Sequence, residues 1–565
     1  MDGLTDMETR RPPFALKLLP SFTDFAFLMP VVWLFGRMNG LKSLLADCDT
    51  GWHIRTGDWI VANHVVPAHD IFSFSKPGAP WFSWEWLSDV LFAWLNGLGG
   101  LRAVVLFSIL LIAVTFTALF RLVRRRSNPI VAFAVTTVAA AGSSIHWLAR
   151  PHLFTLLFLV LFCAALERVR EGHTRLAGVP YLAILPVATV LWTNLHGGFF
   201  VGILVIGAYG AGELLSLAFC GDNPAGNRLL AGRRARQYFL CGLACLAASL
   251  INPYFYRLHM HLVQDLLPYT WQNIQEWLSP SFHHPAAIYF EAMLVLSVVA
   301  AGWKLSKGSF TESVLILLWA HGALLAVRNI PIFMIVAAVP VAAVIQEWLE
   351  RLPEWNVAGW LRAAVGRFNH VAAETGETDR VGRWHLVSAM GLLLLAAVIW
   401  APHPPQKFRA EFDPQRYPAG ALATLRGDLS AHIFTHDEWG DYLIWSLYPS
   451  QKVFVDGRAE FYGDDFEKAY TGILNVRDGW ENTLGRFGVD TILMPPNTPL
   501  SGVLKESGRW RVVYDDRVAL VFRSASRTVG QPPSIALTGE GVSRDREVTK
   551  TQASDRAITE TKTKT

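Results

Sequence analysis

The chain has 565 residues, of which 52% are hydrophobic and 17% charged, and it contains 22 tryptophans. Apolar segments recur from Phe22 to Pro402, so the composition predicts a polytopic membrane protein and excludes a soluble globular one. The net charge of +4 comes from short basic stretches between these segments, and no basic stripe indicates nucleic-acid binding.

Eleven apolar segments approach the length of about 20 residues that crosses a bilayer as a helix. Their expected limits are 19–35, 103–122, 130–148, 153–167, 179–195, 199–220, 239–251, 287–303, 314–327, 330–345 and 386–401. The sequence therefore predicts an α-helical polytopic membrane protein with about eleven transmembrane helices, in a membrane domain of residues 19–403.

Lysine and arginine are concentrated in alternate connections between these segments. Basic examples are Arg124, Arg125 and Arg126 after the second segment, and Arg233, Arg234 and Arg236 after the sixth. Basic residues in short loops favour the cytoplasm. Residues 1–18 and 346–385 are therefore predicted to be cytoplasmic, and the region after 403 to be periplasmic or extracellular. We expect the chain in an inner (plasma) membrane, surrounded by membrane lipids.

Two long connections are predicted on the outer side. The first, residues 47–100, opens with Asp47-Cys48-Asp49, continues as an expected helix over 50–62, and reaches a second aromatic helix through Trp84-Glu85-Trp86. Such dense aromatic residues prefer the headgroup region, so this loop is expected to lie along the membrane. The second outer loop, residues 252–285, is also polar with aromatic anchors.

The last part of the chain changes character. Residues 404–524 are more charged, and short β-branched runs near 433–435, 452–455, 491–493, 511–514 and 518–522 predict strands. Helical patterns near 420–425, 442–447, 466–474 and 480–487 separate most of them, so we expect a small C-terminal extracytoplasmic α/β domain. The tail, residues 525–565, lacks apolar periodicity and is predicted to be disordered.

Many polar residues fall at the predicted outer face, where they could surround one cavity at headgroup depth. They are Asp47, Asp49, His53, Arg55, Asp70, Glu85, Arg150, His152, Asn194, His196, Asn252 and Arg328. Arginine and histidine suit a phosphate group, and a carboxylate can act as a base.

Each of these residues also has a plainer interpretation. Asp47 and Asp49 suit the cap of the helix that follows them, because an acidic residue there satisfies free backbone N–H groups. The histidines suit packing, and Arg150 and Arg328 suit headgroup contact. Two carboxylates one residue apart also resemble a divalent-cation site, but this spacing alone is a weak signal. No cofactor is therefore assigned.

The order of features resembles the C-type membrane glycosyltransferases, called GT-C. The likeness covers about residues 20–525 and rests on these motifs: Asp47-Cys48-Asp49, Trp52-His53, Pro67 to Ser73, Trp84-Glu85-Trp86, Arg150-Pro151-His152 and Asn194-Leu195-His196. Four further motifs are similar to an uncharacterised bacterial branch of GT-C-like proteins: Asn252-Pro253-Tyr254, Arg328-Asn329-Ile330-Pro331, Trp439-Gly440-Asp441-Tyr442 and Val455-Asp456-Gly457-Arg458.

The resemblance implies a sugar donor carried on a polyprenyl phosphate, and a glycan, lipid or protein acceptor on the outer side. It also implies that a first-loop acid is the catalytic base, for which Asp49 is the candidate and Asp47 the near alternative. Arg150, Arg328, His152 and His196 are donor-phosphate candidates on electrostatic grounds. Direct displacement would invert the anomeric centre. Metal dependence varies within the family, and the sugar is not indicated.

Two other classes of protein stay open. A transporter could use the same polar face, but it should carry charged or broken helices at the bilayer midplane. A non-catalytic envelope assembly protein could use the C-terminal domain, including Asp456-Gly457-Arg458 and Glu460, to bind a partner. Convergence of Asp49, Arg150, His196 and Arg328 in one place would favour the enzyme.

Overall fold

The computed structural model describes residues 17–219, 225–264, 274–379 and 382–525. Most of the N-terminal segment 1–18 and the tail predicted over 525–565 lie outside these residues. Each of the eleven predicted spans overlaps one helix. These helices are α2 (Phe22–Gly36), α6 (Leu101–Val123), α7 (Pro129–Ser143), α8 (His152–Arg170), α9 (Tyr181–Leu195), α10 (Phe199–Phe219), α11 (Ala225–Ala248), α14 (Ala287–Ser306), α15 (Phe310–Leu325), α16 (Ile330–Arg351) and α18 (Leu386–Ile399).

Six helices in the described residues are long and apolar enough to cross a membrane: α6, α7, α8, α10, α14 and α16. Four shorter apolar helices accompany them, namely α2, α9, α15 and α18. Helix α11 belongs to neither group, because its first half carries Arg233, Arg234 and Arg236. The protein is thus mostly helical with at least six membrane-span-like helices in this part of the chain, and the count of eleven spans stays a prediction.

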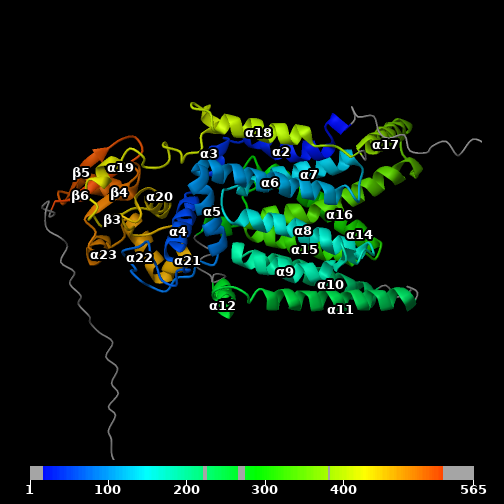
Figure 1. Cartoon of the computed structure of the whole chain (residues 1–565), viewed down its shortest axis with the longest axis horizontal. Helices are drawn as coiled ribbons and strands as arrows, with labels where there is room; N and C mark the ends of the chain where they lie inside the picture. The colour runs from blue at the N-terminus through cyan, green and yellow to red at the C-terminus, as the bar shows by residue number, and fades with distance from the viewer. Residues whose placement is uncertain (1–16, 220–224, 265–273, 380–381, 526–565) are drawn as a thin grey trace, which may run out of the picture. The chain divides into compact units, whose positions relative to one another are not determined.

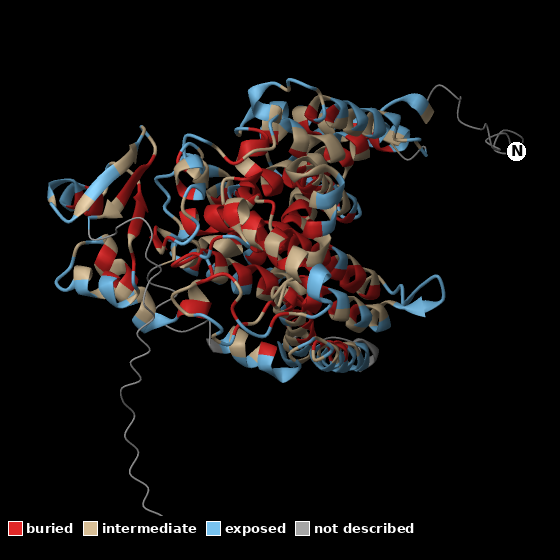
Figure 2. Ribbon diagram, turned by 60° about the vertical axis from the view of Figure 1, so that its left-hand side comes forward, coloured by how far each residue is buried: buried red, intermediate tan, exposed pale blue. Residues whose placement is uncertain are grey.

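The long helices lie side by side with roughly parallel axes (Figure 1). Buried residues concentrate where they pack on one another (Figure 2), and the largest include Trp147, Phe162 and Trp192. Small residues permit this packing. A β-carbon on Gly142 of α7, for example, would come within 2.4 Å of the Met334 methyl carbon on α16.

The expected helices of the first outer loop are present as α4 (Asp49–Asn63) and α5 (Trp86–Gly99). The second outer loop contains α12 (Tyr256–Gln264) and a short 3-10 helix, η2 (Gln275–Trp277). The connection predicted over 346–385 is largely helical, since α16 continues to Arg351 and α17 (Gly359–Asp379) follows.

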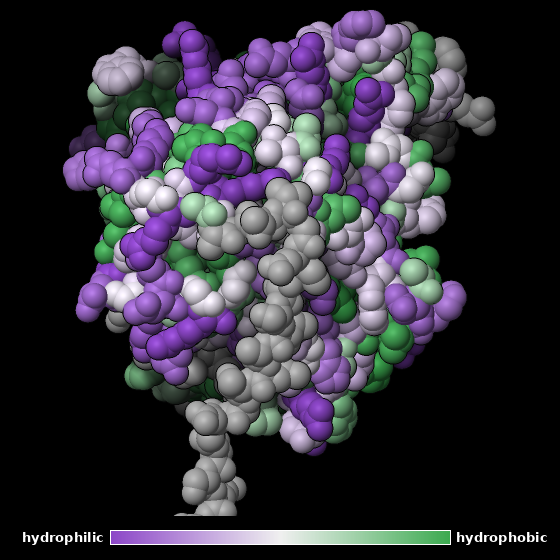
Figure 3. All heavy atoms as spheres, turned by 90° about the vertical axis from the view of Figure 1, so that its left-hand side faces the viewer, coloured by the Kyte–Doolittle hydropathy of each residue, from purple (hydrophilic) through white to green (hydrophobic). Residues whose placement is uncertain are grey.

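The C-terminal domain contains a four-stranded sheet in the order β3-β4-β6-β5. Its strands are β3 (Ile433–Phe434), β4 (Thr491–Met494), β5 (Trp510–Asp515) and β6 (Leu520–Ser524), with β3 and β4 parallel and the other pairs antiparallel. Its helices are α19 (Leu422–Arg426), α20 (Asp437–Leu447), α21 (Ala459–Tyr462), α22 (Asp464–Leu474), α23 (Trp480–Arg486) and α24 (Pro499–Glu506). The visible face of the domain is largely hydrophilic (Figure 3).

The strand predicted over 452–455 is wrong. Val453 forms a single parallel bridge with Ser73 of the first outer loop instead of joining the sheet. Its N–H donates to the Phe72 carbonyl at 3.0 Å, and its carbonyl accepts from the Phe74 N–H at 2.9 Å. A β-branched run predicts extended, buried backbone but not its partner. This segment therefore ties the C-terminal domain to the first outer loop.

Candidate active site

Arg150 forms the centre of a charged cluster. It lies in the turn before α8, and its guanidinium contacts Asp47 at 2.7 Å, Asp49 at 2.7 Å and Glu276 at 3.2 Å. These partners come from the first outer loop, the start of α4 and η2. The cluster therefore joins both outer loops to the membrane helices, and three carboxylates surround one cation.

The electrostatics of this cluster follow from burial and charge. Burial raises the pKa of the Asp49 carboxyl well above its ordinary value, although the Arg150 guanidinium opposes the rise. Burial disfavours the charge on Arg150, but Asp49, Asp47 and Glu276 outweigh it and hold its pKa well above the usual range. Arg150 therefore stays charged, while Asp49 is a carboxylate whose basicity exceeds that of an exposed aspartate.

Helix capping and catalysis do not exclude each other at this position. Helix α4 begins at Asp49, and the residue before it, Cys48, makes no side-chain cap. One Asp47 oxygen accepts the Asp49 N–H at 2.9 Å, while its other oxygen binds Arg150. Asp47 thus supports the start of the helix, and both Asp49 oxygens remain available to side chains.

The two carboxylates do not fit a metal site in this structure. Each offers an oxygen to the Arg150 guanidinium, which lies where a shared cation would be held. Among the residues that the structure describes, no group of three or more His, Cys, Asp or Glu side chains is arranged to hold a metal ion.

A second buried group of polar side chains, linked in a row, lies beside this cluster. His53 Nδ1 lies 2.7 Å from an Asp89 oxygen, and His53 Nε2 lies 3.5 Å from Glu85. The other Glu85 oxygen lies 3.3 Å from His196 Nε2. His196 Nδ1 is 2.8 Å from the Thr155 hydroxyl of α8. The carboxyl of Glu85 therefore lies between two imidazoles.

Burial determines the protonation states of the side chains in this row. It raises the pKa of Glu85 to about 7, against the effect of His53. It lowers the pKa of His53 to about 4 and that of His196 well below its ordinary value. The two histidines are therefore neutral near pH 7, and Glu85 titrates there.

Arg328 lies on η3 (Val327–Asn329), just before α16. Its guanidinium lies 4.5 Å from the centre of the Trp277 ring, and it forms no ion pair with any described residue. Its positive charge still lowers the pKa of both His196 and Glu276. Asp49, Arg150, His196 and Arg328 are thus gathered at one end of the helices.

The other predicted site residues bind protein groups nearby. Arg55 donates to the Trp445 carbonyl at 2.8 Å, and Asp70 binds Arg458 at 2.8 Å. Asn194 accepts from the Trp86 indole and donates to the Ile251 carbonyl, His152 contacts the His146 carbonyl, and Asn252 closes its own turn.

Arg458 itself is buried, being 1% exposed, and binds Asp70 and Asp456. Its guanidinium also lies within about 5 Å of the ring centres of Phe72, Trp81 and Phe461. Asp456 is equally buried. This pair is therefore a link between the C-terminal domain and the first outer loop, and it offers no open surface to a partner.

Sequence reasoning missed three acidic residues of the site: Glu276, Asp89 and Asp441. Glu276 stands among polar and aromatic residues of the second outer loop, which was its only signal. Asp89 lies in the first turn of α5, four residues after Glu85 at its N-cap, so helical spacing could have paired the two. Asp441 stands in the Trp439-Gly440-Asp441-Tyr442 motif of the resemblance, but it lies nearly 400 residues after Asp49 and no local pattern joins the two.

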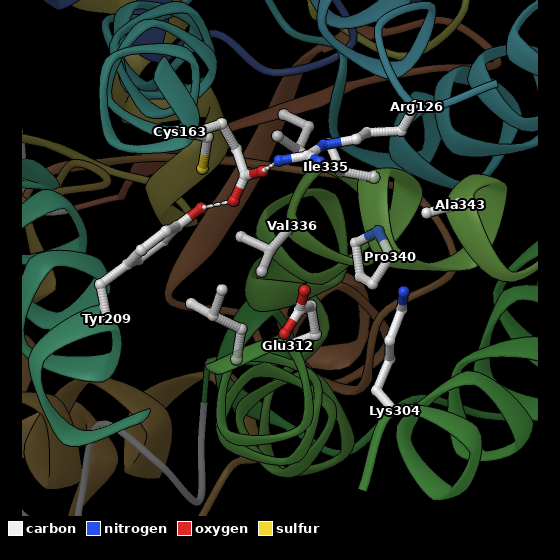
Figure 4. Close-up of a pocket in the computed structure, with 12 residues that line it drawn as sticks. Arg126, Cys163, Tyr209, Lys304, Glu312, Ile335, Val336, Pro340 and Ala343 are labelled. Carbon is white, nitrogen blue, oxygen red and sulfur yellow. Dashed lines mark hydrogen bonds and ion pairs between the residues drawn. The ribbon is translucent and has the colours of Figure 1, made fainter. Parts of the chain in front are cut away.

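A small cavity of about 50 Å³ lies at the other end of α8 (Figure 4). There Glu167 contacts Arg126 at 2.8 Å and the Tyr209 hydroxyl at 2.8 Å. Arg170 binds Glu167 at 3.1 Å and Glu312 at 3.2 Å. A helix of 19 residues is about 28 Å long, so this cavity is remote from Asp49.

No family model and no curated protein matches the chain. Among solved structures, it is similar to the Archaeoglobus fulgidus oligosaccharyltransferase tethered with an acceptor peptide, with a TM-score of 0.50 and 13% identity over 84% of this chain and 68% of that one. The same enzyme in complex with zinc and sulfate gives a TM-score of 0.49 and 14% identity over 84% of this chain and 68% of that one.

ArnT from Cupriavidus metallidurans bound to undecaprenyl phosphate gives a TM-score of 0.41 and 13% identity over 89% of this chain and 98% of that one. At such identities the likeness concerns the fold alone. The resemblance that the sequence motifs indicate is confirmed at that level: the chain has a GT-C-like fold, shared with an oligosaccharyltransferase.

Proposed function

We propose that the protein is an integral membrane glycosyltransferase that moves a sugar from a polyprenyl-phosphate donor to an acceptor on the outer face of the membrane. The observation that carries the proposal is Arg328, a half-buried arginine that forms no ion pair with a described residue and whose charge interacts with Arg150 and Glu276 of the Asp49 cluster. An unpaired charge in such a place favours an anionic ligand. The GT-C-like fold supports a lipid-linked phosphate as that ligand.

The two arginines would have different tasks. Arg150 already contacts three carboxylates, so its charge is largely used in holding Asp49 and both outer loops in place. Arg328, which forms no ion pair with a described residue, is better suited to the donor phosphate.

The transfer can be written with every atom assigned. The acceptor hydroxyl gives its proton to the Asp49 carboxylate, and its oxygen forms a bond to the anomeric carbon. The bond from that carbon to the phosphate oxygen breaks, and the polyprenyl phosphate leaves with the electron pair. Arg328 stabilises the charge that develops on the phosphate. The anomeric centre is inverted.

The proposed topology has eleven spans, a cytoplasmic N-terminus and an extracytoplasmic C-terminal domain, in an inner (plasma) membrane. The basic loops support it, and so does the position of the Asp49 cluster beside the C-terminal domain. Reporters placed after Arg126 and after Arg409 should indicate the cytoplasm and the exterior, respectively. The reverse result would contradict the orientation.

Turnover of polyprenyl-phosphate sugars by the purified protein in lipid vesicles tests the function. Because a positioned base contributes about 100- to 10,000-fold, Asp49→Asn should lose at least about 100-fold in rate. Asp465→Asn is the matched control, because the Asp465 side chain is fully exposed in the C-terminal domain. A protein that transfers no sugar from a panel of such donors, or an Asp49→Asn variant as fast as wild type, would overturn the proposal.

A further inference from the structure

The C-terminal domain packs directly on the helix that carries Asp49. Helix α20 lies against α4, and a β-carbon on Gly51 would come 2.7 Å from the β-carbon of Trp445. On its other side, α20 approaches the segment before α21 even more closely, because a β-carbon on Gly440 would overlap the Val455 carbonyl. Glycine at both positions lets α20 lie between the first outer loop and its own domain.

Asp441 lies one turn before Trp445 on α20 and is only 1% exposed. One of its oxygens accepts the Gly457 N–H at 3.0 Å. A β-carbon on Gly457 would lie 2.7 Å from the other Asp441 oxygen and 2.7 Å from an Asp49 oxygen. The two carboxyl groups therefore border the same glycine, although they belong to different parts of the chain.

The charges around this pair are unequal. Arg150 contacts Asp49, whereas Asp441 forms no ion pair with a described residue. The other titratable groups that face the pair are Asp47, Cys48, Glu276 and Asp456, and the charge of Asp456 is matched by Arg458. Burial raises the pKa of Asp441 well above its ordinary value, and the charges of Asp49 and Asp456 add to that rise. Two buried carboxyl groups beside one cation favour a single negative charge.

We propose that Asp441 is a positioning residue of the sugar-transfer site, which holds Asp49 in place across Gly457 and shares one proton with it. The inference rests on the proposed function and deepens it, because the site is then complete only when the C-terminal domain is packed on α4. In the resting site Asp441 holds the proton, and Asp49 is ionised and paired with Arg150. The acceptor proton goes to Asp49 during transfer and leaves to water afterwards.

The steric part of the proposal is tested by Gly457→Ala. Its β-carbon would displace both carboxyl groups, and a displacement of about 1 Å at a reacting group costs up to about 100-fold in rate. Gly472→Ala in α22 is the matched control, because nothing lies within 4 Å of its β-carbon. The control should keep the wild-type rate. A Gly457→Ala protein as active as the control would overturn the positioning role.

The proton-sharing part is tested by the pH profile of Asp441→Asn. Asparagine keeps the shape and the acceptor for the Gly457 N–H but cannot be ionised. Because Asp441 holds the proton while Asp49 ionises, asparagine removes no negative charge at the acid limb of the rate profile, and that limb should stay in place. The second ionisation, in which Asp441 loses the shared proton, should disappear from the rate profile of the variant. A second ionisation that persists unchanged in Asp441→Asn would overturn the shared proton.

Infrared spectroscopy of the wild-type protein tests the same point without turnover. A buried protonated carboxyl should be visible at neutral pH and should lose intensity in Asp441→Asn. If the wild-type protein shows no such band, the inference fails whether or not the variant folds. If the band loses intensity in Asp441→Asn but no sugar is transferred, the proposed function fails and the carboxyl pair stands.

Discussion

The two ends of α8 hold buried charges of different kinds. At the Arg170 end, two arginines face two glutamates, and Glu167 also accepts from a tyrosine hydroxyl. Each of these four side chains has a partner of opposite sign. At the Arg150 end, three carboxylates surround one arginine, while Arg328 has no ion-pair partner among the described residues.

A balanced set of buried charges stabilises helix packing and leaves nothing for a ligand to neutralise. An unbalanced set costs free energy in the unliganded protein, which an enzyme can recover on binding substrate. The difference between the ends of α8 therefore indicates a structural role for the charges at the Arg170 end and a catalytic role for those at the Arg150 end.

The strongest test of this difference replaces one arginine at each end. Arg328→Gln should raise the KM for the donor by about 10- to 100-fold, because a charge-assisted hydrogen bond contributes about 1.5–3 kcal/mol. Arg126→Gln should leave that KM unchanged and lower the melting temperature, because Glu167 loses a partner. Equal KM shifts in both variants would remove the distinction.

Close packing around the Arg150 end can be tested with two glycines. A β-carbon on Gly57 of α4 would meet the Asp89 carbonyl on α5, so Gly57→Ala should lower the free energy of unfolding by about 1–3 kcal/mol. It should also disturb the contact between His53 and Asp89. Gly97→Ala on α5 meets nothing within 4 Å and should change stability by less than about 1 kcal/mol. The free energy of unfolding of both variants can be measured in detergent. Equal losses in Gly57→Ala and Gly97→Ala would contradict the close approach of α4 and α5.

The carboxyl of Glu85 predicts a pH dependence that the Arg170 end should not share. Its folded-state pKa is raised from 4.5 to about 7, so its contribution to stability is present below pH 4.5 and is lost as the pH rises to about 7. Wild-type stability relative to Glu85→Gln should therefore fall across that window. Thermal unfolding of both proteins from pH 4 to 8 measures the difference, and parallel curves would contradict it.

Much of the fold could be predicted because apolar runs report burial directly. All eleven predicted segments overlap helices, and four of the five predicted strands are present. The failure at 452–455 has a physical cause: Val453 pairs with Ser73, far away in the sequence. Periodicity tells which residues are buried but not which distant segment buries them.

For the candidate site, too, the sequence predicted individual residues but not their distant partners. The first-loop acids could be selected because carboxylates beside a membrane span are unusual, and Arg150 because of its predicted side. Nothing local predicted that Arg150 would lie between Asp47 and Asp49, or that Asp441 would approach Asp49. Asp70 was predicted in the site but pairs with Arg458. A carboxylate can bind a substrate or a buried arginine, and the sequence around Asp70 does not distinguish the two.

The smallest expected effect compares one substitution at both ends. Tyr209 donates to Glu167 at 2.8 Å, and Tyr254 of the second outer loop donates to the Pro67 carbonyl at 3.1 Å. Tyr209→Phe should cost about 0.5–1.5 kcal/mol in unfolding free energy, because one buried acceptor loses its partner. Tyr254→Phe should cost about twice as much, because the Ser83 N–H also loses its acceptor. Only Tyr254→Phe loosens a contact between the loops that carry Glu276 and Asp49, so only it should slow sugar transfer. Slower transfer in Tyr209→Phe at unchanged stability would show that the Arg170 end also takes part in the reaction.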